Sequence, residues 1–112
     1  MKELDVESLR EAAAKSPKGE AFQLIHQTRG VRVGAGVSGG KPFLEVTVKL
    51  LEGGELDLDR LEEQLCLLRA LMGLGYRLDG GGVADVSCEF IASYESVNQE
   101  VEKLGSLIKR VG

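Results

Sequence analysis

The sequence lacks most of the residues with which small domains fix a fold covalently or hold a metal ion. It has two cysteines, Cys66 and Cys88, one histidine, His26, and no C-x-x-C pair. This excludes a disulfide framework and provides no zinc-binding pattern. Tryptophan is absent, and there are only three phenylalanines and two tyrosines, so the core must come from Leu, Val, Ile and Ala.

Long apolar runs and an excess of positive charge are also missing. The net charge is −4 at pH 7, which argues against non-specific binding to nucleic acid or to an anionic membrane. The first ten residues alternate charged and apolar side chains, unlike a signal peptide, and neither end carries a lipidation motif. We therefore expect a cytoplasmic protein that does not enter a membrane.

The first half of the chain predicts one helix followed by a three-stranded meander. Asp5 is a suitable N-cap for a helix over 5–15, and Pro17 ends this helix because it moves Ser16 out of the helical region. Apolar and polar residues then alternate in three runs that are separated by turn-forming residues. The predicted strands are 22–28, 31–37 and 43–51, with turns at 29–30 and 38–41.

The clearest element is a helix over 58–74. Asp57 is its predicted N-cap, and Leu56 and Leu61 occupy hydrophobic-staple positions. Apolar residues form a wide stripe with a 3-4-3-4 repeat, and we expect this stripe to face the core. Its members are Leu58, Leu61, Leu65, Leu68 and Met72, widened by Leu67, Leu71 and Leu74. Any part of the stripe that the fold leaves exposed would mark a surface for a partner.

A second hairpin and a last helix complete the chain. Three consecutive glycines mark the turn of the hairpin. The last helix has Ser93 or Ser96 as its N-cap, and Ser96 with Gln99 has the spacing of a capping box. The predicted elements are a strand over 76–78, a loop over 79–82, a strand over 83–92 and a helix over 94–111.

These elements predict one α+β domain over residues 1–112 with the order α-β-β-β-α-β-β-α. We expect two layers, an antiparallel sheet of about five strands and helices mainly on one of its faces. Such a sheet has a second face that is partly bare and two edges that need protection. Pairing of two copies would cover both, and twofold dimers are the commonest assembly, so a homodimer is predicted.

This order of elements is similar to that of the secretion-chaperone-like architecture. The proteins of that group are small, acidic, cytoplasmic dimers that hold partner proteins. The resemblance lies in element order, size and charge, and no sequence motif carries it. It implies a fold and, by analogy, a chaperone-like role.

The stretch GAGVSGGK, residues 34–41, is the segment that most resembles a nucleotide-binding motif. A P-loop needs Ser or Thr after its Lys to hold magnesium, and it runs from a strand into a helix. Here Pro42 follows Lys41, and the chain continues into FLEVTVKL, which alternates like a strand. The sequence therefore predicts a hairpin turn, and the glycine-rich segment 79–82 is likewise interpreted as a hairpin loop.

The other polar residues form no catalytic or metal-binding constellation. His26 has no neighbouring ligand in the sequence and is interpreted as structural or surface-exposed, and both cysteines fit as small core residues. Acidic residues at the start of helix 58–74 are expected, because they favour the positive end of the helix dipole. These residues are Asp57, Asp59, Glu62 and Glu63. No catalytic residue, cofactor or metal site is predicted.

Two functions from different classes remain. The first is a non-catalytic protein-interaction or chaperone-like module that acts as a homodimer and binds another protein. The alternative is a small-ligand or nucleotide-binding protein that uses the glycine-rich loops 34–41 and 79–82. Its candidate ligand-binding residues are Gly36, Gly39, Gly40, Lys41, Arg29 and Arg32.

A third possibility, nucleic-acid binding along the first three strands, has less support. The basic residues there are Arg29, Arg32, Lys41 and Lys49. No exposed aromatic residue is evident among them to stack on bases, and the net charge of the chain is negative.

Overall fold

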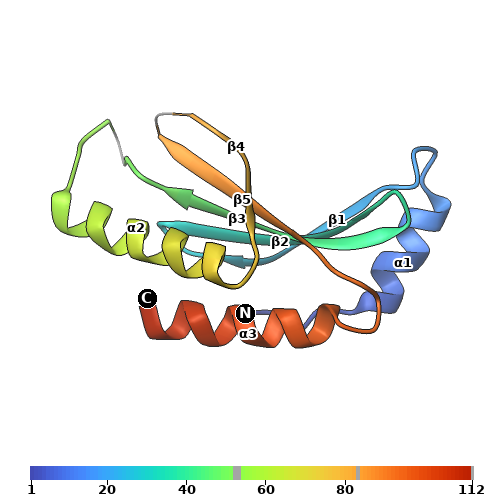
Figure 1. The fold of residues 1–112 in the computed structure, drawn as a ribbon. Helices are drawn as coiled ribbons and strands as arrows, with labels where there is room; N and C mark the ends of the chain where they lie inside the picture. The colour runs from blue at the N-terminus through green and yellow to red at the C-terminus, as the bar shows by residue number, and fades with distance from the viewer. Residues whose placement is uncertain (52–53, 83, 112) are drawn as a thin grey trace.

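The structure is a computed structural model that describes residues 1–51, 54–82 and 84–111. The described residues form three helices and five strands in the predicted order (Figure 1). The elements are α1 (Val6–Lys15), β1 (Ala21–Gln27), β2 (Val31–Ser38), β3 (Lys41–Lys49), α2 (Leu58–Gly73), β4 (Arg77–Gly81), β5 (Asp85–Ile91) and α3 (Val97–Val111).

The five strands form one antiparallel sheet with the order β1-β2-β3-β5-β4. The first three strands are a meander, and β5 pairs with β3, so that β4 is left at the edge opposite β1. Within the part of the chain that the structure describes, no helix is long and apolar enough to cross a membrane.

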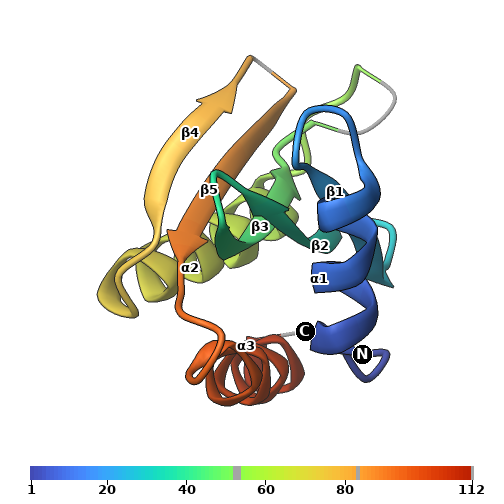
Figure 2. The same ribbon diagram turned by 90° about the vertical axis from the view of Figure 1, so that its right-hand side faces the viewer.

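The helices lie on one side of the sheet, as predicted (Figures 1 and 2). Each of them contributes buried residues to a single core, and the strands contribute the side chains that face the helices. On β2 these are Val33, Ala35 and Val37, which are almost completely buried. Buried cores of this kind supply most of the free energy of folding, at about 25 cal/mol per Å² of apolar surface removed from water.

The capping predictions are largely confirmed. Asp5 caps α1 by accepting a hydrogen bond from the Ser8 backbone N–H at 3.1 Å, and Asp57 caps α2 by accepting one from Asp59 N–H at 3.1 Å. At α3 the reciprocal pair is Ser93 with Ser96, and not Ser96 with Gln99. The helix α3 begins at Val97, three residues later than predicted, after a turn in which the Val97 N–H donates to the carbonyl of Ser93.

The face that α2 turns to the core differs from the prediction. Its buried residues are Gln64, Leu67, Leu68 and Leu71, whereas Leu58, Leu65 and Met72 are exposed by 69%, 50% and 46%. The buried side-chain amide of Gln64 donates a hydrogen bond to the carbonyl of Gly30 at 3.1 Å. This bond ties α2 to the β1–β2 turn, with the helix rotated away from the predicted stripe.

Two further predictions need correction. Cys66 is exposed, although Cys88 is buried as expected. Gly80 and Gly81 belong to β4 and are paired with β5, so the hairpin loop is shorter than the predicted 79–82. The predicted start of the following strand, Val83, lies outside the described residues, and β5 begins at Asp85.

Both edge strands carry a bulge. In β1 the register shifts between Leu24 and His26, and in β4 it shifts between Leu78 and Gly80. The bulged residue of β1, Ile25, is buried, and its carbonyl accepts a hydrogen bond from the Lys2 N–H at 2.8 Å. Bulges twist an edge and interrupt its row of free backbone groups.

The glycines of β2 make room for aromatic rings. Gly34 and Gly36 face away from the helices, and a Cβ atom built on either would collide with a ring, that of Phe22 at Gly34 and that of Phe43 at Gly36. The two ring centroids lie 6.4 Å apart. The first part of GAGVSGGK is therefore a strand on which two phenylalanines rest.

We expect Gly36→Ala to destabilise the fold more than Gly34→Ala. At Gly36 the added Cβ would also lie 2.8 Å from the backbone carbonyl oxygen of Ala21, which cannot rotate away, whereas at Gly34 the nearest atoms all belong to the ring of Phe22. Overpacking of this kind costs about 1–3 kcal/mol. Urea unfolding of both variants measures the difference, and an equal loss for the two would contradict the explanation.

Candidate functional site

The face of the sheet that lies away from the helices is called the outer face here. The strand register places its side chains in rows that run across the sheet. The first row is Phe22, Gly36, Phe43 and Ile91, and the second is Leu24, Gly34, Glu45, Glu89 and Arg77. Figure 1 shows no helix over this face.

An apolar patch occupies one end of the outer face. It consists of Phe22, Leu24, Phe43 and Ile91, and we call it the outer patch. Phe22 is 56% exposed and Ile91 64% exposed, while Phe43 is half-buried. Because Gly34 and Gly36 have no side chains, the phenylalanine rings lie over the backbone of β2 and form a continuous apolar surface.

Three carboxylates lie next to the outer patch. Glu45 and Glu89 are directly opposite each other on β3 and β5, and Asp79 is the bulged residue of β4. Burial raises the pKa of the Glu89 carboxyl above its usual range, and the charge of Asp79, a hydrogen bond with Asp79 and the charge of Glu45 raise it further. Like charges placed opposite each other destabilise a sheet, so a cation near this group would be stabilised.

The third row of the outer face is neutral or basic, and beyond it Lys49 lies opposite Asp85. Thr47 and Ser87 share a hydrogen bond at 3.0 Å between their hydroxyl oxygens, and Arg32 lies opposite Thr47. Lys49 is two residues along β3 from Thr47, and therefore Arg32 and Lys49 share the outer face, as the alternation predicted.

The second part of the glycine-rich stretch is a tight hairpin turn. Ser38 pairs with Lys41, and Gly39 and Gly40 between them have φ values of 60° and 77°. Two central residues with positive φ define a type I′ turn, which suits the twist of an antiparallel hairpin. The prediction of a turn is confirmed, and no helix follows it.

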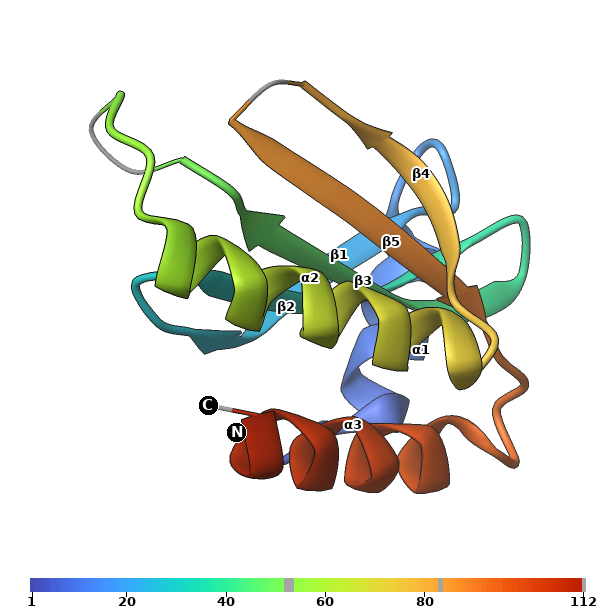
Figure 3. The ribbon, with the colours of Figure 1, turned by 60° about the vertical axis from the view of Figure 1, so that its left-hand side comes forward.

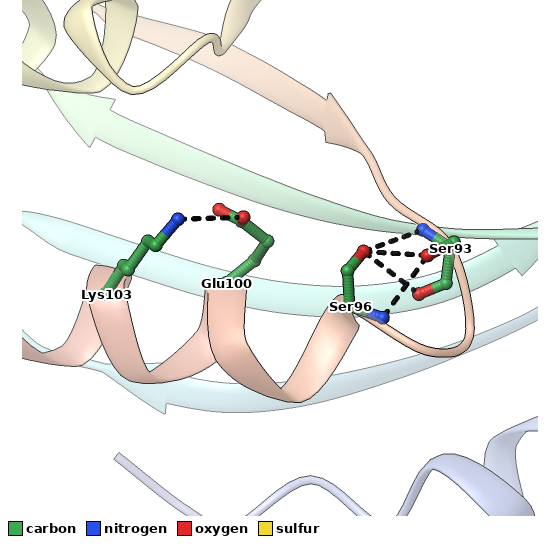
Figure 4. Close-up of polar contacts among 4 residues, drawn as sticks. All are labelled: Ser93, Ser96, Glu100 and Lys103. Atoms are coloured by element: carbon green, nitrogen blue, oxygen red, sulfur yellow. Dashed lines mark hydrogen bonds and ion pairs between the residues drawn. The ribbon is translucent and has the colours of Figure 1, made fainter.

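Lys41 and Gly40 line an open pocket of about 430 Å³ together with the connection from β5 to α3. The hydroxyls of Ser93 and Ser96 in this pocket lie 2.8 Å apart, and each also accepts a hydrogen bond from the backbone N–H of the other residue (Figure 4). One turn further along α3, Lys103 pairs with Glu100 at 3.3 Å. The hydroxyls of the two serines and the charges of Lys103 and Glu100 thus have partners within the chain.

The candidate anion-binding residues do not meet at one place. Arg29 lies in the β1–β2 turn and lines a pocket of about 210 Å³ with Lys49, Arg60, Glu55 and Asp57. Lys41 is the first residue of β3 and lies opposite Ser38, the last residue of β2, which is roughly 20 Å from Arg32 at about 3.3 Å per residue. A small ligand cannot contact both groups at once.

Two buried polar atoms have no hydrogen-bond partner in the described part of the chain, His26 Nε2 and the Tyr76 hydroxyl. Burial lowers the pKa of His26, and the N-terminal ammonium lowers it further. Burial is also the main cause that raises the pKa of Tyr76, followed by the charge of Glu100. His26 is thus favoured as neutral imidazole and Tyr76 as neutral phenol.

Metal binding has no support among residues 1–51, 54–82 and 84–111, where no group of three or more His, Cys, Asp or Glu side chains could hold an ion. The acidic residues at the start of α2 include the N-cap Asp57, in keeping with their interpretation from the sequence.

Sequence reasoning missed the outer patch. A signal for it was present in the alternation of the strands. Ile91 lies on the same face of β5 as Glu89, and Phe22 lies on the opposite face of β1 from Ala21 and Gln23.

We expect Glu89→Gln to stabilise the protein at pH 7 and to have little effect well below pH 4.5, the usual pKa of a glutamate. The raised pKa means that the folded state binds the proton of Glu89 more tightly than the unfolded state does. The contribution of Glu89 to the free energy of unfolding is therefore fully present at low pH and is lost as the pH rises through the folded-state pKa. Glutamine removes a partly buried charge and its repulsion from Asp79 and Glu45. Thermal unfolding of Glu89→Gln at the two pH values measures the effect, and Glu11→Gln on the exposed face of α1 is the control. An equal shift of the Glu89→Gln melting temperature at the two pH values would contradict the explanation.

Comparisons of this chain with protein-family models, with curated proteins and with solved structures found no match. The resemblance to the secretion chaperones therefore rests on element order, size and charge alone. A function has to be inferred from the surface of the molecule itself.

Proposed function

We propose that the protein is a cytoplasmic, non-catalytic interaction module that acts as a homodimer and binds a segment of another polypeptide on its outer face. The outer patch is the observation that supports this proposal. Its members Phe22, Leu24 and Ile91 are exposed by 56%, 38% and 64%. Exposed apolar side chains that are contiguous and rimmed by polar residues are typical of protein-binding surfaces.

The outer face is suited to a polypeptide because it presents aromatic anchors that are held in place. Phe22 and Phe43 are held over the glycines of β2, so they lose little conformational freedom when a partner covers them. Aromatic anchors of this kind contribute a large share of binding free energy in protein interfaces.

The charges beside the outer patch favour a partner of a particular composition. Burial is the main cause that raises the pKa of Glu89, and repulsion from Asp79 and Glu45 raises it further. A lysine or arginine of the partner would relieve that repulsion. The proposed ligand is therefore a segment with apolar side chains followed by a basic residue.

The alternative of a small-ligand or nucleotide-binding protein has weaker support. Gly34 and Gly36 lie beneath aromatic rings, which keeps a phosphate from their backbone. Gly39, Gly40 and Lys41 remain open, and a Lys41→Ala variant with an unchanged response to nucleotides would count against this function.

The test is capture of partners from the native cell extract by the tagged protein, quantified by mass spectrometry. We expect a polypeptide retained in stoichiometric amount by the wild type and reduced about tenfold or more by Phe22→Lys or Ile91→Lys, because each substitution places a charge in the apolar contact. Leu56→Lys is the matched control, since Leu56 is also 56% exposed but lies off the sheet.

Circular dichroism of the three variants establishes that each is folded. Partner retention that is the same for all three variants would contradict the proposal. So would a preparation that carries a stoichiometric small molecule and no polypeptide.

A further inference from the structure

The outer patch is elongated across the strands of the sheet. Phe22, Phe43 and Ile91 lie in one row of the strand register, which runs from β1 over Gly36 of β2 to β5. Three steps between neighbouring strands, at about 4.8 Å each, give this row a length of about 14 Å. In Figure 3, as in Figure 1, no helix of the described residues lies over this side of the sheet. A partner can therefore reach the row along its whole length.

The outer face offers a partner side chains and no backbone hydrogen bonds. The strands β2, β3 and β5 each have a paired strand on both sides. An extended partner segment on this face would lose water from one side of its own backbone without gaining hydrogen bonds in return, and unpaired buried backbone groups are costly. Its backbone could pair only at the edges, β1 or β4, and both carry bulges. An α-helix avoids this cost because its own N–H and C=O groups bond to each other.

The length of the row fits a short helix. An α-helix rises about 1.5 Å per residue, so that about nine residues span the row. On such a helix the side chains at i, i+3 or i+4, and i+7 lie on one face. Three apolar side chains with this spacing would contact Phe22, Phe43 and Ile91 in turn.

Charges of opposite sign border the row on its two sides. Lys41 is exposed and lies two residues before Phe43 on the same face of β3, whereas Glu45 lies two residues after Phe43 and is opposite Glu89. At the end of the row, Ile91 lines two open pockets. One of them, of about 430 Å³, includes Lys41, and the other, of about 520 Å³, includes Glu89.

The charges within the two pockets leave this difference in sign in place. Arg77 and Asp79 line the same pocket as Glu89, so with Glu45 this side has three carboxylates and one guanidinium. On the other side, Glu95 lines the pocket of Lys41, but no ion pair of Lys41 is formed within the described residues. A partner cation is thus favoured on the first side and a partner anion on the second.

We propose that the polypeptide partner binds the outer patch as an amphipathic α-helix that crosses the strands, with basic side chains toward Glu45 and Glu89 and acidic side chains toward Lys41. This inference rests on the proposed function and adds the conformation and the orientation of the bound segment. The apolar stripe of the helix lies along the row, and its two charged flanks fix the direction in which it runs. The helix would add a third layer to the domain, on the face that its own helices leave bare.

The first test compares two synthetic peptides of identical composition, each of about 14 residues or four helical turns. In the helical-pattern peptide, leucines recur at i, i+3, i+4 and i+7, with lysines on one flank and glutamates on the other. In the alternating peptide, the same residues are rearranged so that leucines and charged residues alternate. Fluorescence anisotropy should show about tenfold or more tighter binding of the helical-pattern peptide. The Cα chemical shifts of this peptide, labelled with ¹³C, should be helical in the complex.

The second test places the helical-pattern peptide on the surface with variants. Phe22→Lys should weaken its binding about tenfold or more, and Leu56→Lys should leave it unchanged. Lys41→Glu should weaken it about threefold or more, because the new carboxylate faces the acidic flank of the peptide. The matched control is Lys49→Glu, the same reversal on the same face of β3 but six residues beyond Phe43. Circular dichroism establishes that each variant is folded.

Equal affinity for the two peptides, or extended Cα shifts in the complex, would overturn the inference. Equal effects of Lys41→Glu and Lys49→Glu would do the same, and so would failure of both peptides to bind at about 1 mM. The proposed function would stand after any of these results if capture of a polypeptide from the extract still depends on Phe22. Loss of that dependence would instead remove the proposed function itself.

Discussion

The structure depends on a sheet that can be covered on one face only. Three short helices supply enough apolar surface to bury the side of β2 that carries Val33, Ala35 and Val37, and they all lie on that side. The opposite side of the same strand carries Gly34 and Gly36, and the sheet therefore completes its outer face with the rings of Phe22 and Phe43. Sheets with edge or surface glycines are often stabilised by aromatic residues of neighbouring strands in this way. The surface that would bind a partner is thus a consequence of the aromatic rings that cover the glycines on the outer face.

Much of the fold could be predicted from local chemistry. Asp5 and Asp57 are caps, Pro17 ends a helix, and Gly39 with Gly40 fits a type I′ turn, so the element order follows from residues that act on their immediate neighbours. The antiparallel meander follows from the alternation along β2 and β3. These features need no knowledge of the tertiary structure.

The orientation of α2 and the outer patch could not be predicted in the same way. Eight apolar residues surround more than half of α2, and the helix could bury either side of that stripe. The buried side depends on contacts that are distant in sequence, such as the hydrogen bond from Gln64 to the carbonyl of Gly30, 34 residues away. In β1 the bulge at Ile25 changes the phase of alternation, so that His26 turns toward the helices and Gln27 outward. Neither the orientation of α2 nor the bulge in β1 can be predicted from the periodicity of the sequence alone.

The bulges at both edges have a consequence for how the protein behaves at high concentration. An exposed apolar patch on a β-rich chain is a hazard, since flat sheets with free edges add strands from other molecules and grow into fibrils. Here β1 and β4 are interrupted at Ile25 and Asp79, and the carbonyl of Ile25 is already taken by the Lys2 N–H. The sheet therefore has a fixed width of five strands, and the protein can keep an apolar surface available without providing a template for amyloid growth.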